Sequence, residues 1–240
     1  MYKTVLITGG TRGIGQALVK QYLNHGYTVI ATGSSEKSVV SCKKAYPEVR
    51  WYKCNLKSAQ SIEQFAQALN GEPLSLVIHN AGVQQARDLF VGTDEAISIE
   101  DETMINFTAP ILLTRLLFDN VQRATGTWVF ATSGLAIAPK QSSPIYCANK
   151  AGLRTFCKSF NGQIKRHNSG IKVCEAILPL VDTEMTQGRG KGKISPAQAA
   201  LEVFEGAEKG KKEIHIGKIK LVMKLRALFP NLIENIMLKE

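Results

Sequence analysis

The chain has 240 residues, of which 44% are apolar, and a formal net charge of +10. This length suits one compact domain with a sizeable core, and no apolar run is long enough to span a bilayer. The positive charge attracts polyanions such as nucleotides, but the basic residues show neither an RNA-binding aromatic signature nor zinc-finger spacing. We therefore expect no nucleic-acid partner.

The cysteines are too dispersed for a metal or redox pair. None of the five belongs to a CxxC motif, and the opening "MYKTVLITGG" predicts a strand and a turn rather than a secretory signal. We expect reduced thiols, no metal site and a cytoplasmic location.

Short β-branched runs alternate with longer helical patterns along the chain. Strands are predicted at 3–8, 27–33, 49–54, 74–79, 127–133, 171–178 and 212–217. Helices are predicted at 13–25, 36–46, 58–70, 100–123, 143–167 and 195–209. Several strands are nearly continuous apolar runs, as in a parallel sheet buried on both faces. The alternation predicts a single Rossmann-type α/β fold, in which a doubly wound parallel sheet is flanked by helices and binds ligands beyond the strands' carboxyl ends.

A glycine-rich turn follows the first predicted strand. The turn is "TGGTRGIG", residues 8–15, and a helical pattern comes directly after it. Gly9, Gly13 and Gly15 let the backbone turn tightly and approach a pyrophosphate, which the helix N-terminus would bind. The alternative is a turn without a ligand, but the strand–turn–helix context favours a dinucleotide site.

The end of the second predicted strand favours NADP(H) over NAD(H). NAD-binding proteins usually place an acid there, about twenty residues after the turn. Here the sequence is "ATGSSEK", and the first carboxylate is Glu36. Arg12, Ser34 and Ser35 could bind a 2′-phosphate. Two alternatives stay open: Glu36 could reach the ribose, and the serines could be turn or N-cap residues.

Five motifs in order indicate a family. "TGGTRGIG", "HNAG", "MINFTAP", "TSG" and "YCANK" occur along the chain. With them, residues 3–217 resemble the short-chain dehydrogenase/reductase family, classical type. The turn "ATGSSE" is also similar to that of NADPH-dependent 3-oxoacyl reductases. "TSGLA" through "PIYCANKA" is similar to a bacterial oxidoreductase branch encoded near teichoic-acid D-alanylation genes.

The resemblance implies hydride transfer between a nicotinamide and a small-molecule carbonyl or alcohol. It implies that Tyr146 is the acid/base, Lys150 its helper, Ser133 the carbonyl-polarising hydroxyl and Asn106 the holder of a proton-relay water. The implied cofactor contacts, together with the turn residues, are Thr8, Gly9, Thr11, Arg12, Gly13, Ile14, Gly15, Ser34, Asn55, Leu56, Asn80, Ala81, Gly82, Tyr146, Lys150 and Thr183.

The chemistry of these side chains is consistent with those roles. A phenol with a pKa of about 10 is a poor proton donor at neutral pH, and a lysine four residues on, on the same helix face, should lower that pKa. The hydroxyls of Ser133 and Tyr146 could both meet negative charge on a carbonyl oxygen. Singly, each residue has a structural alternative: a snorkelling lysine beside a tyrosine, a serine that caps its own turn, or an asparagine bonded to backbone. Together they favour catalysis over the alternative function, a dinucleotide-binding sensor or scaffold with little turnover.

The chain departs from the family pattern in three places. His79 replaces an asparagine at the fourth strand end, where we expect it to pack rather than catalyse. Leu178-Pro179 replaces Pro-Gly, and the loop "EMTQGRGKGK" at 184–193 is short and cationic. An acidic substrate would suit that loop, but a flexible solvated loop is an equal alternative. Loops 83–95, 134–145 and 184–194 should shape the substrate pocket.

The tail from residue 218 combines apolar residues with lysines and arginine. We divide the chain into a dinucleotide-binding domain at 1–217 and a basic amphipathic C-terminal helix at 218–240, which Pro230 breaks or restarts. This helix could lie on an anionic membrane surface, or it could pack on its own domain or on a partner subunit. The family resemblance also implies a homodimer or homotetramer, formed through the helices at 100–123 and 143–167.

Overall fold

The computed structural model describes residues 3–69, 71–91 and 95–238. Residue 70, at the end of the helix predicted at 58–70, and residues 92–94 of the predicted substrate loop lie outside the described residues. So do the first two residues of the predicted domain and the last two of the predicted tail.

Seven parallel strands form one sheet, in the order β3-β2-β1-β4-β5-β6-β7. They are β1 (Thr4–Ile7), β2 (Thr28–Gly33), β3 (Arg50–Lys53), β4 (Leu76–His79), β5 (Thr127–Ser133), β6 (Lys172–Leu178) and β7 (Glu213–His215). The strand order reverses between β1 and β4, which makes their carboxyl ends the place where ligands bind in such sheets. The predicted doubly wound parallel sheet is confirmed.

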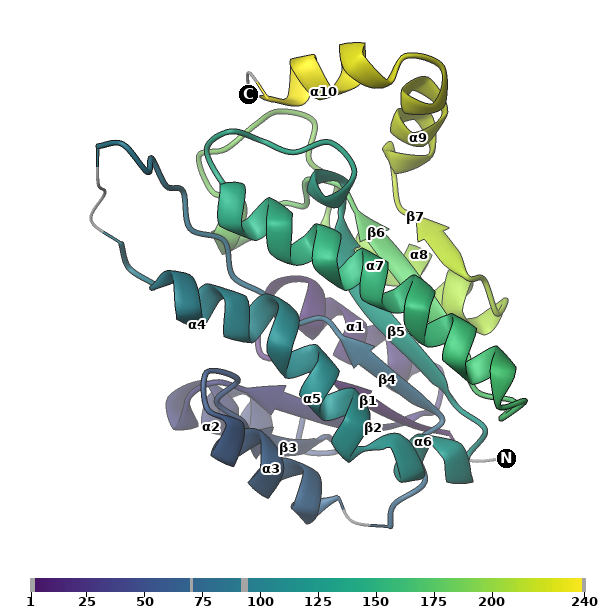
Figure 1. The fold of residues 1–240 in the computed structure, drawn as a ribbon. Coiled ribbons are helices and arrows are strands. Elements are labelled where there is room, and N and C mark those ends of the chain that lie inside the picture. Colours follow the sequence, from purple (N-terminus) through teal and green to yellow (C-terminus); the bar gives the residue numbers. More distant parts are fainter. Residues whose placement is uncertain (1–2, 70, 92–94, 239–240) are drawn as a thin grey trace.

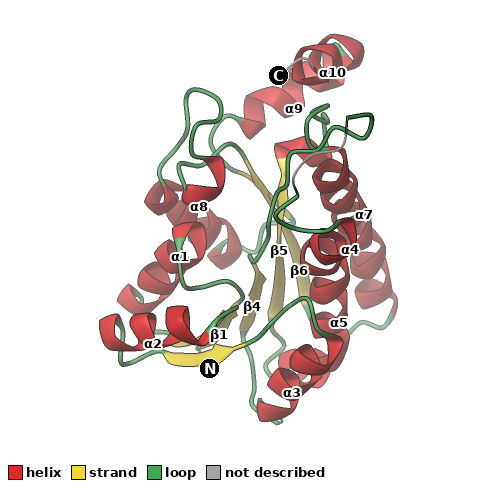
Figure 2. Ribbon diagram, turned by 90° about the vertical axis from the view of Figure 1, so that its left-hand side faces the viewer, coloured by secondary structure: helices red, strands yellow, loops and turns green. Residues whose placement is uncertain are grey.

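Helices cover both faces of the sheet (Figures 1 and 2). One face carries α1 (Gly13–Asn24), α2 (Glu36–Ala45) and α8 (Pro196–Glu208), and the other carries α3 (Ala59–Ala68), α4 (Ile99–Thr103), α5 (Ala109–Leu116), α6 (Phe118–Arg123) and α7 (Pro144–Arg166). Successive strand side chains point to opposite faces, so Leu6 packs in one core cluster and Val5 and Ile7 in the other. This two-sided burial explains the continuous apolar runs in the sequence.

The prediction of one helix over 100–123 is wrong. The chain forms α4, a π-helical turn at Met104–Thr108, then α5 and, after Leu117, α6. The π turn contains Asn106, whose side chain is fully buried. Its Nδ2 donates to the Val83 carbonyl oxygen (2.7 Å), and its Oδ1 accepts from the Val83 amide (2.9 Å). The irregular turn, a feature frequent at functional sites, therefore fastens the segment that follows β4.

The tail forms two helices, α9 (Ile219–Leu228) and α10 (Pro230–Leu238), so Pro230 restarts the helix rather than ending it. Ile219 anchors α9 by packing with Ile137 and Ile177. Both helices lie beyond the carboxyl ends of the central strands (Figures 1 and 2). Across the part of the chain that the structure describes, no helix has the length and apolar character needed to cross a membrane. All five cysteines are described, buried and free.

The turn after β1 is tied closely to the end of β4. The Thr8 hydroxyl accepts hydrogen bonds from the amides of Asn80 and Ala81, each at 3.1 Å. Asn80 Nδ2 donates to the carbonyl oxygens of Thr8 (3.0 Å) and Gly9 (3.3 Å). Gly9 has a φ of +67°, and a Cβ placed on it would lie 2.9 Å from the Ala81 Cα. Only glycine satisfies both the conformation and the close approach.

We expect Gly9→Ala to destabilise the protein far more than Gly26→Ala. Gly26 has a similar φ of +72° but no atom within 4 Å of the added methyl, so its substitution costs only the backbone strain, about 1–2 kcal/mol. At Gly9, overlap with Ala81 adds about 1–3 kcal/mol. Urea unfolding of the two variants measures the difference. Equal losses would show that the turn is not packed against β4 as described.

Candidate active site

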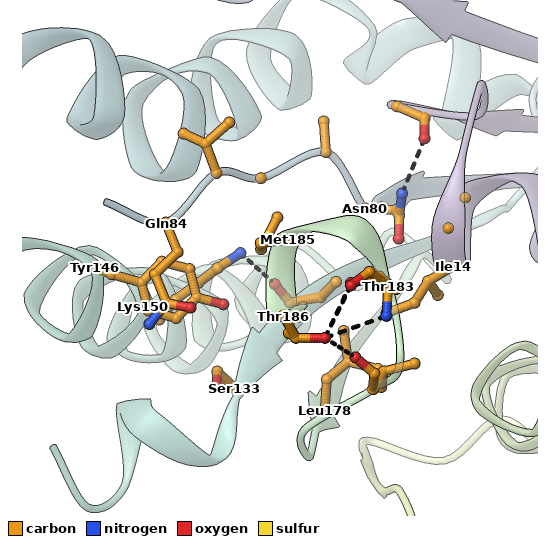
Figure 3. A pocket seen from close by; sticks show the side chains of 18 of the residues that line it. Ile14, Asn80, Gln84, Ser133, Tyr146, Lys150, Leu178, Thr183, Met185 and Thr186 are labelled. Atoms are coloured by element: carbon orange, nitrogen blue, oxygen red, sulfur yellow. Dashed lines mark hydrogen bonds between the residues drawn. The ribbon is translucent and has the colours of Figure 1, made fainter. Parts of the chain in front are cut away.

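A cavity of about 530 Å³ lies at the carboxyl ends of the central strands, a volume typical of small-molecule sites. The turn after β1 lines one end, and the start of α7 lines the other (Figure 3). The expected site residues that line it are Gly9, Thr11, Arg12, Gly13, Ile14, Gly15, Ser34, Asn55, Leu56, Asn80, Ala81, Gly82, Ser133, Tyr146, Lys150 and Thr183. Thr8 and Asn106 lie behind the wall and hold its backbone in place.

Tyr146 and Lys150 stand one turn apart at the start of α7, which begins with Pro144 at its first position. Lys150 Nζ is buried and donates to the Ala131 carbonyl oxygen of β5 at 2.8 Å. The same Nζ lies 5.8 Å from the centroid of the Tyr146 ring. Figure 3 shows both side chains at the same end of the cavity as Ser133 and Gln84.

Burial dominates the ionisation of this pair. It raises the pKa of Tyr146 to about 12, against a smaller lowering by hydrogen bonding from Ser133. It lowers the pKa of Lys150 to about 8. The expectation that Lys150 lowers the pKa of Tyr146 is therefore wrong for this structure. The lysine ammonium lies over the ring and bonds to Ala131. The loss of hydration on burial is the largest cause of the raised pKa of Tyr146.

Gly82 leaves the space into which Asn106 and Lys150 converge. A Cβ on Gly82 would lie 3.1 Å from Asn106 Oδ1 and 3.5 Å from Lys150 Nζ. Both polar groups of the Asn106 amide bind the Val83 backbone, which is the structural alternative that the sequence left open. Asn106 thus fixes the backbone of the segment after β4, at Val83, beside Lys150.

Ser133 ends β5 and has two neighbours for its hydroxyl. Its Oγ accepts from the Leu135 amide at 3.1 Å, as the cap of the 3-10 turn Gly134–Ala136. The same hydroxyl bonds toward Tyr146 and opposes the rise in the pKa of that phenol. The capping role that the sequence offered as an alternative is therefore present, together with the arrangement expected of a polarising hydroxyl.

The two serines after β2 differ in their surroundings. Ser35 caps α2 by accepting from the Ser38 amide at 3.3 Å, whereas Ser34 is exposed and lines the cavity. Glu36 belongs to the first turn of α2 and is not among the cavity-lining residues. The cavity wall at this end therefore carries a hydroxyl and no carboxylate from this segment.

Arg12 has a partner that the sequence did not indicate. Its guanidinium pairs with the Glu184 carboxylate at 2.9 Å, and both side chains are about three-quarters exposed. The two residues lie 172 positions apart. An exposed pair of this kind contributes little stability, so the arginine can exchange its partner for another anion.

A buried ion pair organises the loop that follows β4. The Arg87 and Glu102 side chains are fully buried and meet at 3.0 Å, and Arg87 also donates to the Ile97 carbonyl oxygen at 2.7 Å. Nearby, Gln84 Nε2 donates to Ser143 Oγ at 3.0 Å, just before α7. Sequence reasoning missed this pair, because arginine and glutamate side chains are usually solvated.

The expected substrate loops contribute Gln84, Leu135, Lys140, Met185 and Arg189 to the cavity wall. The tail also reaches the cavity, which the sequence did not indicate. Its lining residues are Lys218, Ile219, Val222 and Met237.

Two other expectations concern residues outside the catalytic set. His79 packs between aromatic rings, 4.8 Å from Phe130 and 5.6 Å from Trp128, and burial lowers its pKa to about 3. It is a packed strand-end residue, as expected. Within the described ranges, no cluster of three or more His, Cys, Asp or Glu side chains is placed to hold a metal ion.

Known proteins share this sequence pattern and this fold. The family model for short chain dehydrogenases matches residues 3–193. The uncharacterized oxidoreductase DltE of Bacillus subtilis (strain 168) is 34% identical over 220 residues, which cover 88% of this chain and 86% of that protein.

Two solved structures have the same architecture. A short chain dehydrogenase from Burkholderia cenocepacia J2315 in complex with NADP has a TM-score of 0.88 at 19% identity, over 99% of this chain and 98% of that one. A short chain dehydrogenase/reductase from Burkholderia phymatum in complex with NAD has a TM-score of 0.82 at 17% identity, over 96% and 95%. With most of its length matched by the family model and a relative above 30% identity, the chain belongs to the short-chain dehydrogenase/reductase family of oxidoreductases.

Proposed function

We propose that the protein is an NADPH-dependent oxidoreductase that interconverts a carbonyl and an alcohol, with Tyr146 as its acid/base. The observation that carries the proposal is the single cavity with the glycine-rich turn at one end and Ser133, Tyr146 and Lys150 at the other. A dinucleotide laid along this wall would bring its nicotinamide toward the hydroxyls. When bound, this cofactor supplies or accepts the hydride.

The residues of the chain would handle the carbonyl oxygen and the proton. Ser133 and Tyr146 would donate hydrogen bonds to the oxygen, on which negative charge builds as the carbon is reduced. Tyr146 would then give its proton to that oxygen, and the product is an alcohol. With its pKa raised by burial to about 12, the phenol carries its proton at neutral pH, as a proton donor requires.

Lys150 would stabilise the phenolate that remains after proton transfer. Its ammonium is already placed over the ring and fixed by Ala131, so little reorganisation is needed when negative charge develops. Thr8 and Asn106 are positioning residues in this proposal, because each binds the backbone of the cavity wall rather than facing the cavity.

Arg12 and Ser34 support the preference for NADPH. Both line the cavity where the 2′-phosphate of an NADP would lie, whereas Glu36 does not. Glu184 pairs with Arg12 and would compete with the phosphate for it. The homodimer or homotetramer, the cytoplasmic location and the domain boundary at residue 217 stay predictions.

Tyr146→Phe should lower turnover of a carbonyl substrate by at least about 100-fold while NADPH still binds, because only the proton donor is lost. Absorbance of NADPH follows turnover, and fluorescence titration follows binding. Tyr46→Phe is the control, since this tyrosine caps α2 outside the cavity lining. Normal turnover of Tyr146→Phe would refute the acid/base role. Tight NADPH binding without turnover of any carbonyl by the wild type would favour the sensor.

Arg12→Ala should weaken NADPH binding by about tenfold or more and change NADH binding little, because a charged hydrogen bond to the 2′-phosphate is lost. Glu184→Gln should have the opposite effect and tighten NADPH binding, since Arg12 is then free. Fluorescence titration with both nucleotides measures this. An equal loss for NADPH and NADH in Arg12→Ala would show that Arg12 does not read the 2′-phosphate.

Burial of Lys150 should make the protein's stability depend on pH. The pKa of Lys150 is about 8 in the folded protein and 10.5 in its ordinary state, so between these values the unfolded chain binds the proton and the folded chain does not. Stability from this group therefore rises with pH across that window, by about 3 kcal/mol in all.

Lys150→Met removes this titration. Relative to wild type, the variant should be most stable near neutral pH and should lose that advantage as the pH approaches 10.5. Urea unfolding at several pH values measures the difference, with Lys20→Met on the exposed side of α1 as a control for deleting a charge. A difference that does not change with pH would contradict the buried ammonium.

A further inference from the structure

The outward side of the tail is apolar. We call it the outer face of α9–α10, and its residues are Leu221, Leu225, Leu228, Phe229, Leu232 and Ile236. Leu228 is 71% exposed and Leu232 is 57% exposed. Surface helices of globular proteins usually present polar residues to water and bury an apolar stripe, so this face is the reverse of the common pattern.

The spacing gathers these side chains on one side of each helix. Leu221, Leu225 and Leu228 follow an i, i+4, i+7 pattern, and Leu232 and Ile236 follow an i, i+4 pattern. Other sides of the same helices face the protein: Val222 and Met237 line the cavity. The tail is therefore apolar on both sides, and its inner contacts leave the outer face unpartnered.

Positive charge borders the outer face. Lys220 and Lys224 are exposed on α9 beside the leucines. Within the described tail, residues 218–238, the acid is Glu234, and Arg226 binds it at 2.6 Å. Lys220 and Lys224 therefore place two exposed positive charges beside the apolar outer face.

We propose that the outer face of α9–α10 docks on the surface of a bilayer that carries anionic headgroups. Leucines and Phe229 would enter the boundary between headgroups and acyl chains, and Lys220 and Lys224 would contact lipid phosphates. This occupant satisfies both properties of the face at once. Docking on a bilayer does not depend on which reaction the protein catalyses, so this proposal is independent of the proposed function.

Two other occupants fit the face less well. In a symmetric dimer, a second copy would bring Lys220 and Lys224 near their own counterparts and add another net charge of +10, with no acid on the face to compensate. A nucleic acid would meet the lysines but leave the leucines in water. Charge complementarity and apolar burial together therefore favour an anionic lipid surface.

Docking in this way would place the cavity beside the membrane. The helices that form the outer face also supply cavity wall through Ile219, Val222 and Met237, so the lipid surface and the cavity would contact different sides of the same helices. The helices α9 and α10 would then separate the cavity from the lipid surface.

Flotation of the full-length protein with two kinds of vesicle tests the proposal. We expect binding to vesicles of equimolar phosphatidylglycerol and phosphatidylcholine, and much weaker binding to phosphatidylcholine alone. Lys220→Gln with Lys224→Gln should weaken binding by about fivefold per lysine. The matched control is Lys43→Gln with Lys44→Gln, two exposed lysines in the last turn of α2, which should bind as wild type does.

The apolar contribution has its own matched pair. Leu221→Glu on α9 should weaken vesicle binding by about tenfold or more, whereas Leu201→Glu, an exposed leucine on α8, should not. NADPH titration of each variant shows that it is folded. The proposal is overturned if the wild type does not float with anionic vesicles, or if Leu221→Glu and Leu201→Glu lose binding equally. It is also overturned if sedimentation shows that Leu221→Glu breaks an oligomer while vesicle binding is unchanged.

Discussion

The hydrogen bonds between Thr8 and the end of β4 hold the site together. They join the two strands between which the order of the sheet reverses, and they fix the glycine-rich turn against Ala81. Because the Thr8 hydroxyl accepts from two backbone amides, those partly buried donors have partners within the protein. Both walls of the crevice are therefore set by backbone contacts, and the side chains that face the cavity are free for ligands.

At the other end of the cavity, polar side chains are buried at a cost in free energy. Lys150 and Asn106 are buried and Tyr146 is partly buried, and the protein compensates with the Ala131 carbonyl and the Val83 backbone. Such sites lower stability, but they keep polar groups oriented before a substrate arrives, which is how preorganised sites stabilise developing charge. The buried Arg87–Glu102 pair extends the same principle to the adjoining loop.

Sequence reasoning succeeded where the signal is local. Strands buried on two faces read as apolar runs, and motifs identified the turn, Ser133, Tyr146 and Lys150, which the structure brings to one cavity. Their roles in binding and catalysis stay predictions. It failed at residues 104–108, because no residue in this stretch distinguishes a π turn from an α-helix. It could not give the Arg12–Glu184 pair or the tail's place on the cavity wall, since both depend on contacts between distant segments. It misjudged the pKa of Tyr146 because spacing on a helix does not say how far the phenol is removed from water, and burial is what raises this pKa.

The position of β4 has a consequence for the nascent chain. All four of its residues are buried, and its outer edge pairs with β5, which is made some fifty residues later. Until β5 is made, the nascent chain contains a partial sheet in which the apolar edge of β4 has no partner strand. Unpaired edge strands of this kind can pair with other chains and cause aggregation. A chain terminated before β5 would carry a finished glycine-rich turn and still be prone to aggregate, so chaperones that bind emerging chains should act on this protein between the synthesis of β4 and β5.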